Sequence, residues 1–467
     1  MNVKSPAPRV KHSPLKGLPP GLQKGRRPGV GKIQKAATAL RPEDPQALFQ
    51  RGFALHQQGQ LQEAQNIYQQ VLRLNPQHFD ALHLGGVILA QTGDPAGVEA
   101  AIARAIQINP AHASAWSNRG NSLQELKRHA EALTCYDKAI ELNPNYAEAH
   151  RNRGDCRWAQ DLQKEAAEDY ERAQQLDPAF MPGWLKLGDM CKKLSRWPRA
   201  QECYQRYVQS HPEHWMAHFN LGFVQIQLND SVGAEQSFRT VLQHQPNHAD
   251  AHGNLGIALQ KNRQLQAALD SYERAIAHNP NHADAYSNRG LLLQELNRTD
   301  EAMHCYNRAL EIKPDFANAW WNKSLSLLLM GDFENGWPMY EYRWRSVQLA
   351  TDRPWKTPRW DGKTDLTGKT VFLFGEQGFG DTIQFCRYAL NIKALGAARV
   401  ILEVQNPLVT LMRAMPGVDE IIGQGMPIPA HDVQCPLMSL PWLLQTRIDN
   451  MPAPIPYLRV DPTLRTL

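Results

Sequence analysis

Hydrophobic and small residues recur along most of the chain with a period of 34 residues. A proline closes each period, in an unbroken series of Pro42, Pro76, Pro110, Pro144, Pro178, Pro212, Pro246, Pro280 and Pro314. From Pro76 onward, a glycine lies 24 residues before each proline, a small residue 12 before it and an aromatic or aliphatic residue eight before it. A period of this length indicates stacked supersecondary units, each too small to bury its apolar face alone.

The pattern predicts two antiparallel helices in each unit. Glycine and alanine mark the places where two helix backbones approach closely, and the aromatic residue fills the groove beside that contact. The proline ends the second helix, because it has no N–H to donate and it clashes with the preceding turn. This arrangement resembles the tetratricopeptide repeat (TPR). The resemblance covers residues 43–348 and implies a mainly α fold, a TPR solenoid or superhelix whose concave groove binds a polypeptide partner.

Eight full repeats run from residue 43 to residue 314, and a ninth follows at 315–348. The ninth has Ser324 at the glycine place and Gly336 at the alanine place, and it has no terminal proline. Terminal repeats are often atypical, because the last one must cover the stack or join the next domain.

A column of asparagines marks the first predicted helix of most repeats. It lies 26 residues before the proline place and comprises Asn118, Asn152, Asn220, Asn254, Asn288 and Asn322, with Lys186 interrupting it. A carboxamide offers two donors and an acceptor, so such a column can hold an extended peptide by its backbone. The alternative is that each asparagine bonds the backbone of the neighbouring repeat. The column also resembles the asparagine ladder of the O-linked N-acetylglucosamine transferases, which implies binding of a polypeptide.

Histidines form two pairs at i,i+4 spacing, His214 with His218 and His248 with His252. Two such side chains lie on one helix face, but no third ligand has the spacing that a metal site needs. The first histidine of each pair takes a place that other repeats fill with an aromatic residue. We therefore expect packing at the helix entrance, with no metal and no cofactor.

After residue 348 the period stops. Residues 349–368, rich in Trp, Arg and Pro, predict a packed junction and linker. Short apolar runs predict strands at 370–374, 399–404, 420–422 and 432–435, with helices at 382–394 and 407–415. Strand–helix alternation of this kind predicts a doubly wound parallel sheet over residues 369–467.

A glycine-rich turn follows the first predicted strand, with Gly375, Gly378 and Gly380 before Asp381. Open parallel sheets bind ligands at this end of the strand, and glycines let backbone amides at a helix start approach a ligand oxygen. The glycine spacing differs from the dinucleotide-binding fingerprint, which excludes a nicotinamide cofactor. The turn also lacks the Lys-Ser/Thr pair of a P-loop.

Asp381 has two interpretations. With Gln384 three residues later it forms a capping-box pattern, which alone explains both residues. The other interpretation is a carboxylate that acts as general base on a sugar or protein hydroxyl.

The segments 378–385, 416–419 and 435–441 resemble the first half of a GT-B glycosyltransferase, most similar to bacterial TPR-fused glycosyltransferases akin to the heptosyltransferases. The resemblance covers about residues 370–460. It implies a Rossmann-like half over 369–467, with Asp381 as the acceptor-side base and Gly375, Gly378, Gly380 and Gln384 in a ligand-binding loop. The second, donor-binding half of such enzymes is expected to begin near Leu467, so we expect an incomplete domain that is inactive alone.

Charge is unevenly distributed along the chain. Residues 1–42 hold ten of the 51 Lys and Arg and none of the 46 Asp and Glu, so residues 43–467 have a net charge of −5. A basic, Pro- and Gly-rich segment cannot bury enough apolar surface to order itself, which predicts a disordered tail at 1–42. The acidic remainder speaks against nucleic acid as a partner.

The seven cysteines form no CxxC pair, and five lie in predicted repeat helices, where a thiol behaves as a small hydrophobe. This usage favours a reducing, cytoplasmic location. No apolar run predicts a signal peptide or a membrane span.

Two functions follow from the sequence. The first is a protein–protein interaction scaffold that binds extended peptide and has a truncated glycosyltransferase-like domain. The second is a glycosyltransferase that transfers a sugar from a nucleotide-sugar to a protein or glycan acceptor, with the donor half supplied elsewhere.

Overall fold

The computed structural model describes residues 44–346, 353, 355–376, 378–452 and 457–458. The predicted basic tail at 1–42, the last two residues of the ninth repeat and the start of the predicted linker lie outside the described residues. The chain divides into two compact units, residues 1–229 and 230–467, which are described separately.

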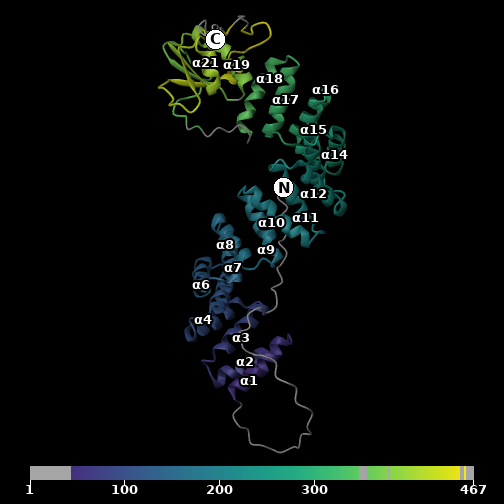
Figure 1. Ribbon diagram of the computed structural model, residues 1–467, viewed down its shortest axis with the longest axis vertical. Coiled ribbons are helices and arrows are strands. Elements are labelled where there is room, and N and C mark those ends of the chain that lie inside the picture. Colours follow the sequence, from purple (N-terminus) through teal and green to yellow (C-terminus); the bar gives the residue numbers. More distant parts are fainter. Residues whose placement is uncertain (1–43, 347–352, 354, 377, 453–456, 459–467) are drawn as a thin grey trace, which may run out of the picture. The chain divides into compact units, whose positions relative to one another are not determined.

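The first unit consists of helices that follow one another as hairpins (Figure 1). Close packing joins α1 to α2, α3 to α4, α5 to α6, α7 to α8 and α9 to α10. The bounds are α1 Pro45–Gln57, α2 Leu61–Leu74, α3 Phe79–Thr92, α4 Pro95–Ile108, α5 Ala113–Glu125, α6 His129–Leu142, α7 Ala147–Ala159, α8 Gln163–Leu176, α9 Met181–Lys193, α10 Trp197–Ser210 and α11 Trp215–Gln227. Each helix pair occupies one predicted repeat.

The periodic glycine lies directly against the periodic aromatic ring. A Cβ atom added to Gly120 would lie 2.5 Å from Cε1 of Tyr136, and one added to Gly188 would lie 2.8 Å from Cε1 of Tyr204. The periodic alanines, such as Ala132, are completely buried. The predicted close approach is thus confirmed, with one refinement: the ring packs on the glycine itself, so even alanine would displace it.

A hydrogen bond ties most period prolines to the helix that follows. Six residues after the proline, an indole or imidazole Nε–H donates to the proline's carbonyl oxygen; we call this contact the proline clip. The bonds are 2.8–3.2 Å long and run from Trp116, His150, Trp184, His218, His252 and Trp320 to Pro110, Pro144, Pro178, Pro212, Pro246 and Pro314. After Pro280 the corresponding residue is Tyr286, which has no side-chain N–H.

The turn inside each helix pair contains one residue with a left-handed backbone. These residues also recur every 34 positions, with φ between 55° and 83°, at Gly59, Gly93, Lys127, Asp161, Ser195, Asn229, Arg263, Asn297 and Gly331. Glycine adopts this conformation without steric cost, whereas an L side chain is strained there. Six of the nine turns therefore hold a residue that the backbone disfavours.

The second unit continues the repeats and ends in a parallel sheet. Its helical bounds are α12 Ser231–His244, α13 Ala249–Lys261, α14 Leu265–His278, α15 Ala283–Glu295, α16 Thr299–Ile312, α17 Ala317–Leu329 and α18 Phe333–Tyr340. The last helix, α18, is only eight residues long and continues into a 3-10 helix, η1, at Glu341–Arg345. The predicted ninth repeat is therefore present with a shortened second helix.

Four parallel strands form the sheet, in the order β3-β2-β1-β4. The strands are β1 Thr370–Phe374, β2 Arg399–Val404, β3 Glu420–Gly423 and β4 Val433–Pro436, so each predicted strand is confirmed to within one residue. The helical segments are α19 Phe379–Phe385, η2 Cys386–Tyr388, α20 Ala389–Ala394, η3 Asn406–Leu408, α21 Val409–Met412, η4 Leu437–Ser439 and α22 Leu440–Leu443. The helix predicted at 382–394 thus begins earlier and is interrupted by η2.

The two faces of the sheet are covered differently. On one face, Val371 and Leu373 pack with buried residues of the helical segments, such as Ile392. On the other face, Phe372, Phe374 and Ile401 pack against Trp344 and Trp355. A doubly wound sheet has helices on both faces; in the described part of the chain, Trp344 at the end of the ninth repeat and Trp355 of the junction cover the second face.

The ninth repeat and the sheet share a core. Trp337 of α18 contacts Phe385 of α19 with ring centroids 5.9 Å apart. Trp360, only 3% exposed, donates its backbone N–H to the carbonyl oxygen of Gln434 in β4 at 2.9 Å. The described part of the predicted linker is therefore packed against the sheet, as a junction.

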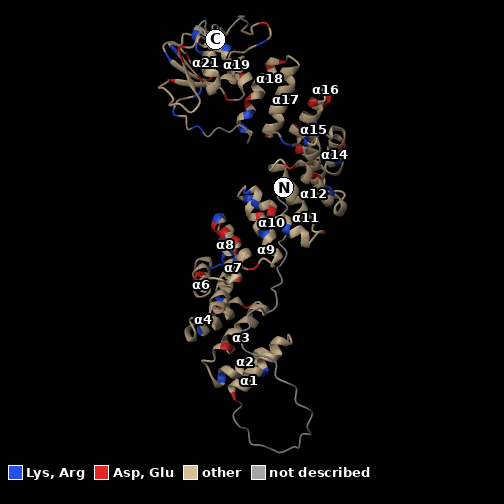
Figure 2. Ribbon diagram, in the orientation of Figure 1, with Lys and Arg blue, Asp and Glu red and all other residues tan. Residues whose placement is uncertain are grey.

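Acidic and basic residues are mixed along the described helices (Figure 2). None of the described helices is long and apolar enough to cross a membrane. All seven cysteines are free and buried.

Candidate functional site

Three asparagines of the column are engaged by the preceding repeat. Nδ2 of Asn118 lies 3.0 Å from Nε2 of His83, and Nδ2 of Asn152 lies 3.5 Å from Oγ of Ser117. Asn220 accepts from Nζ of Lys192 at 2.8 Å and donates to Oδ1 of Asp189 at 3.2 Å. The partners are side chains and not the backbone that the structural alternative predicted. In these repeats the amide helps to hold neighbouring helices together.

The other three asparagines have uncommitted amides. Asn254, Asn288 and Asn322 lie at the same place on α13, α15 and α17, and all three are partly exposed. Their side chains make no hydrogen bond to any other described residue. Because α13 packs on α15 and α15 on α17, these amides follow one another along adjacent helices of the second unit.

The first histidine of each pair caps a helix. Nδ1 of His214 accepts the backbone N–H of Ala217 at 3.1 Å, and Nδ1 of His248 accepts that of Ala251 at 3.2 Å. A side-chain acceptor at the N-cap satisfies an amide that the first helical turn leaves unpaired. The first member of each pair therefore caps its helix, and His214 also packs as expected, with its ring centroid 5.1 Å from that of Tyr207. The described residues contain no group of three or more His, Cys, Asp or Glu placed to hold a metal ion.

Asp381 caps its helix from within the first turn. The helix α19 begins at Phe379, so Gly378 is the N-cap and Asp381 is the third helical residue. Oδ2 of Asp381 accepts the backbone N–H of Gly378 at 3.2 Å. The predicted capping box, with Asp381 as the cap and Gln384 as its partner, is therefore wrong. Asp381 takes the role that was assigned to Gln384, which is exposed.

The glycines of the turn differ in their surroundings. Gly375 is buried, and a Cβ atom there would lie 2.6 Å from Oγ1 of Thr382. Gly378 and Gly380 are exposed, and the ring of Phe379 between them is 52% exposed. The turn thus presents two open backbone positions and an aromatic ring beside the partly exposed carboxylate of Asp381.

A buried charge cluster lies behind this turn. The guanidinium of Arg343, in η1, is 1% exposed and contacts Oε1 of Glu341 and Oε1 of Glu376, each at 2.6 Å. It also donates to Oγ of Ser439 at 2.8 Å. Arg359 reaches the same serine and the second oxygen of Glu341. The cluster joins the last repeat, the residue that follows Gly375, and η4 after β4.

Burial raises the pKa of Glu376 to about 7, although the charge of Arg343 opposes that rise. Its side chain is 3% exposed, and its Oε2 has no hydrogen-bond partner among the described residues. The sequence analysis missed this residue. A charged residue two positions after a buried strand was the available signal, but its partner, Arg343, lies 33 positions away in the sequence.

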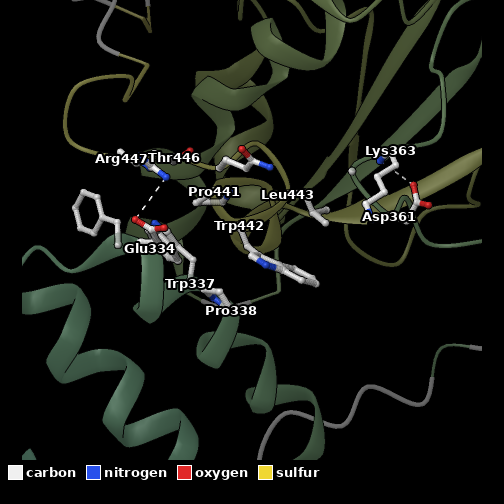
Figure 3. A pocket seen from close by; sticks show the side chains of 13 residues that line it. Glu334, Trp337, Pro338, Asp361, Lys363, Pro441, Trp442, Leu443, Thr446 and Arg447 are labelled. Atoms are coloured by element: carbon white, nitrogen blue, oxygen red, sulfur yellow. Dashed lines mark hydrogen bonds and ion pairs between the residues drawn. The ribbon is translucent and has the colours of Figure 1, made fainter.

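A cavity of about 380 Å³ opens where α18 meets the sheet region. Trp337 and Pro338 of α18, Pro441 and Trp442 of α22, and residues 361–363 line it (Figure 3). An ion pair of 3.4 Å between Glu334 and Arg447 lies at one side. Trp442 is 41% exposed, so the cavity presents an aromatic surface to solvent.

Comparison with protein families identifies the repeats. Models described as tetratricopeptide repeat match residues 45–78, 113–146, 186–251, 249–282 and 283–316. The chain contains tetratricopeptide repeats. TPR repeats form scaffolds that are typical of protein–protein interaction. A comparison with curated proteins gave no match.

Solved structures give more distant likenesses. A Pseudomonas aeruginosa pilF structure is 20% identical with a TM-score of 0.38, covering 43% of this chain and 92% of that one. The Cut9-Hcn1 hetero-tetramer of the APC/C is 19% identical with a TM-score of 0.33, covering 57% and 52%. MamA of Desulfovibrio magneticus RS-1 is 18% identical with a TM-score of 0.34, covering 36% and 96%.

Proposed function

We propose that the chain is a TPR scaffold that binds a polypeptide in extended form along its asparagine column. The observation that supports this proposal is the row of uncommitted, partly exposed amides at Asn254, Asn288 and Asn322 on successive first helices. Each carboxamide can donate to a peptide carbonyl oxygen and accept a peptide N–H. The engaged asparagines at 118, 152 and 220 then contribute more to the stack than to the ligand.

The binding is weak and tolerant of sequence. Each amide contact stabilises the complex by about 1 kcal/mol, whereas ordering an extended peptide costs about 1–2 kcal/mol per residue. Side chains of the peptide must supply the remainder, which leaves the asparagine column as a general backbone holder.

The test is a pool of random-sequence twelve-residue peptides, bound to the purified chain and to Asn254→Ala/Asn288→Ala/Asn322→Ala. The triple variant is expected to lose most of the retained peptide. The variant Gln266→Ala, which removes an exposed amide from a second helix, serves as the matched control. Equal retention by all three proteins would contradict the proposal.

A second candidate function is glycosyl transfer, with residues 369–467 as the acceptor-side half of a GT-B-like fold. The observation that favours it is the partly exposed carboxylate of Asp381 on a glycine-rich turn, at the carboxyl edge of β1. The direction of the strand order changes at β1, because β2 and β3 lie on one side of it and β4 lies on the other. Open parallel sheets bind ligands at the carboxyl edge beside such a point. Asp381 would act as base on an acceptor hydroxyl.

Titration calorimetry with UDP-, GDP- and ADP-sugars tests this second function. Saturable binding that Asp381→Asn weakens, with an unchanged circular dichroism spectrum, would support it. No heat from any of the three donors would leave the scaffold as the function of the chain. On either outcome, we assign residues 1–42 to a tail, 43–348 to the repeats and 349–368 to a junction.

A further inference from the structure

A groove of about 670 Å³ lies between α12, α13 and α14 in the second unit. Its lining includes three leucines, Leu242, Leu255 and Leu259, and two arginines, Arg239 and Arg274. His252 and His278 also line it, and their rings stack with centroids 5.5 Å apart. The groove therefore combines an apolar floor with basic side chains.

The chain contains its own reference for this place, because the residues exactly two periods earlier lie in the first unit. There, the guanidinium of Arg199 is paired with Glu171 at 2.8 Å and also with Glu202. It lies 5.5 Å from the ring centroid of Trp184, and Arg206 lies 4.6 Å from the same ring. An arginine, an indole and two carboxylates thus fill the earlier site.

Three residue differences leave more space at the later site and change its charge. Ala267 stands where the earlier site has Arg199, and His252 stands where it has Trp184, so a guanidinium and part of an aromatic ring are missing. Arg239 stands where the earlier site has Glu171, which reverses the charge. Because His252 keeps the hydrogen bond to the carbonyl oxygen of Pro246, at 2.9 Å, the helix stays in place while the space opens.

The two arginines have charge to offer. In two other repeats the basic residue at the place of Arg274 pairs with a carboxylate three residues later, as Lys138 does with Glu141 and Arg308 with Glu311, both at 2.8 Å. After Arg274 that place holds Ala277, and Arg274 has no ion-pair partner among the described residues. Arg239 pairs with Glu235 through Nε and Nη2, at 3.0 and 2.9 Å, and Nη1 takes no part in that pair.

One carboxylate, Asp270, also lines the groove, and its Oδ1 accepts from Nε2 of Gln266 at 2.9 Å. The lining holds two arginines and one acid, and Glu235, outside the lining, already pairs with Arg239, so Arg274 is the arginine of the lining without a carboxylate partner among the described residues. An incoming carboxylate restores at this site the opposite-sign pairing that the earlier site makes internally.

We propose that this groove binds an acidic peptide segment, with an Asp or Glu carboxylate placed on Arg239 and Arg274 and an adjacent aliphatic side chain on the three leucines. A volume of this size holds a few residues of a ligand. The site is separate from the asparagine column. Asn254 follows His252 by two positions, about 200° around the helix axis, so the two side chains leave α13 on opposite sides.

The test uses fluorescence anisotropy of the full chain with a labelled peptide, Glu-Leu-Glu-Leu-Gly, at low salt. The peptide Gln-Leu-Gln-Leu-Gly, which lacks the carboxylates, is the probe control. Arg274→Ala is expected to weaken binding of the acidic peptide about tenfold or more, because it removes a charge-assisted hydrogen bond. Arg206→Ala, the equivalent change two periods earlier, is expected to leave the affinity unchanged.

A second variant fills the groove without removing a basic group. Ala267→Met places an uncharged side chain in the space that Arg199 fills in the earlier site, and we expect it to abolish binding while the circular dichroism spectrum and the unfolding midpoint stay within the range of the parent chain. The variant without Asn254, Asn288 and Asn322 is expected to bind the acidic peptide normally, which separates this site from the proposed asparagine column. Equal affinity for the Gln peptide, or equal losses in Arg206→Ala and Arg274→Ala, would overturn the proposal.

Discussion

The helical repeats and the parallel-sheet region satisfy their charged groups in different ways. In the repeats, ion pairs such as Arg308 with Glu311 are 41% and 64% exposed and connect neighbours on one helix. In the sheet region, Arg343 is 1% exposed, and besides Glu341, two residues before it, its side-chain partners Glu376 and Ser439 come from positions 33 and 96 residues farther along the chain. The first arrangement is local and exposed, whereas the second is buried and joins distant segments; within the repeats, Asp169, which is 3% exposed and pairs with Arg153 and Arg157, is an exception to the first arrangement.

This difference predicts how much stability each region loses when one charged group is removed. An exposed pair three residues apart contributes little, and its loss is absorbed by water. A buried charge cannot be absorbed in this way, so removing one partner leaves the others desolvated without compensation. The exposed pairs of the repeats should therefore tolerate loss of charge, and the buried cluster of the sheet region should not.

The largest effect is expected for Arg343→Met. The change leaves the buried Glu376 without its guanidinium, while Glu341 keeps Arg359, and is expected to destabilise the sheet region by about 3–5 kcal/mol. Hydrogen exchange measured by mass spectrometry over β1 and η1 reports this loss locally. Arg308→Ala is the matched control and should leave the exchange nearly unchanged, because water replaces its exposed ion pair. Slow exchange over β1 in Arg343→Met would remove the distinction drawn between the two regions.

The next effect is a pH dependence due to Glu376. The folded chain holds the proton on this carboxyl up to about pH 7, whereas the unfolded chain releases it near pH 4.5. Between these values the folded state binds more protons, so the free energy of unfolding falls as pH rises, by up to about 3 kcal/mol.

Glu376→Gln removes that contribution. The stability of the variant relative to the parent is expected to increase steadily from pH 4.5 to pH 7 and then to level off. Urea unfolding followed by tryptophan fluorescence measures it, with Glu311→Gln, an exposed acid in α16, as the control. A constant difference between variant and parent across this range would show that Glu376 does not titrate there.

A smaller effect separates two glycines of α13. A Cβ atom on Gly256 would lie 2.5 Å from Cε1 of Tyr272, whereas the nearest atom to one on Gly253 would be 3.4 Å away. Gly256→Ala is expected to destabilise the repeats by about 1–3 kcal/mol through overpacking, and Gly253→Ala to stabilise them by about 0.5–1 kcal/mol. Thermal unfolding followed by circular dichroism compares them, and effects of the same sign would contradict the glycine–tyrosine contact.

The smallest effect tests the left-handed turns. Lys127 has φ 60°, and Lys127→Gly is expected to stabilise the first unit by about 0.5–1 kcal/mol, since relief of strain exceeds the added entropy of the unfolded chain. Gly93→Ala makes the opposite change at the equivalent turn, where no atom lies within 4 Å of the new Cβ. The two variants should shift the urea midpoint in opposite directions.

Sequence reasoning located the repeats and strands because both depend on local patterns. The 34-residue period fixed every helix pair, and short apolar runs fixed β1 to β4. The left-handed turns were missed because the nine positions share no residue type: they hold glycine, Asn, Asp and Ser, which favour turns, but also Lys127 and Arg263, which do not. The shortened α18 and the tryptophans that cover the sheet depend on packing between distant segments, which no window of sequence displays.

The candidate sites were less predictable. Asn118 and Asn254 occupy the same place in the period, yet only the first meets a histidine, His83, one repeat earlier. The role of Asp381 depended on where α19 begins, and the helix starts two residues before it. The groove beside Arg274 arises from what is missing at Ala267, and an absence is visible only against the equivalent residues two periods earlier.

The proline clip also bears on how the chain would respond to tension. A clip closes a ring across the end of each repeat, so a pulling force must break it before the next helix can swing away. Pro246 and Pro314 are held in this way. The residue that follows Pro280 at the same interval is Tyr286, whose side chain has no N–H to donate. Within the second unit, stretching should therefore begin at the boundary after Pro280, which is expected to separate at the lowest force.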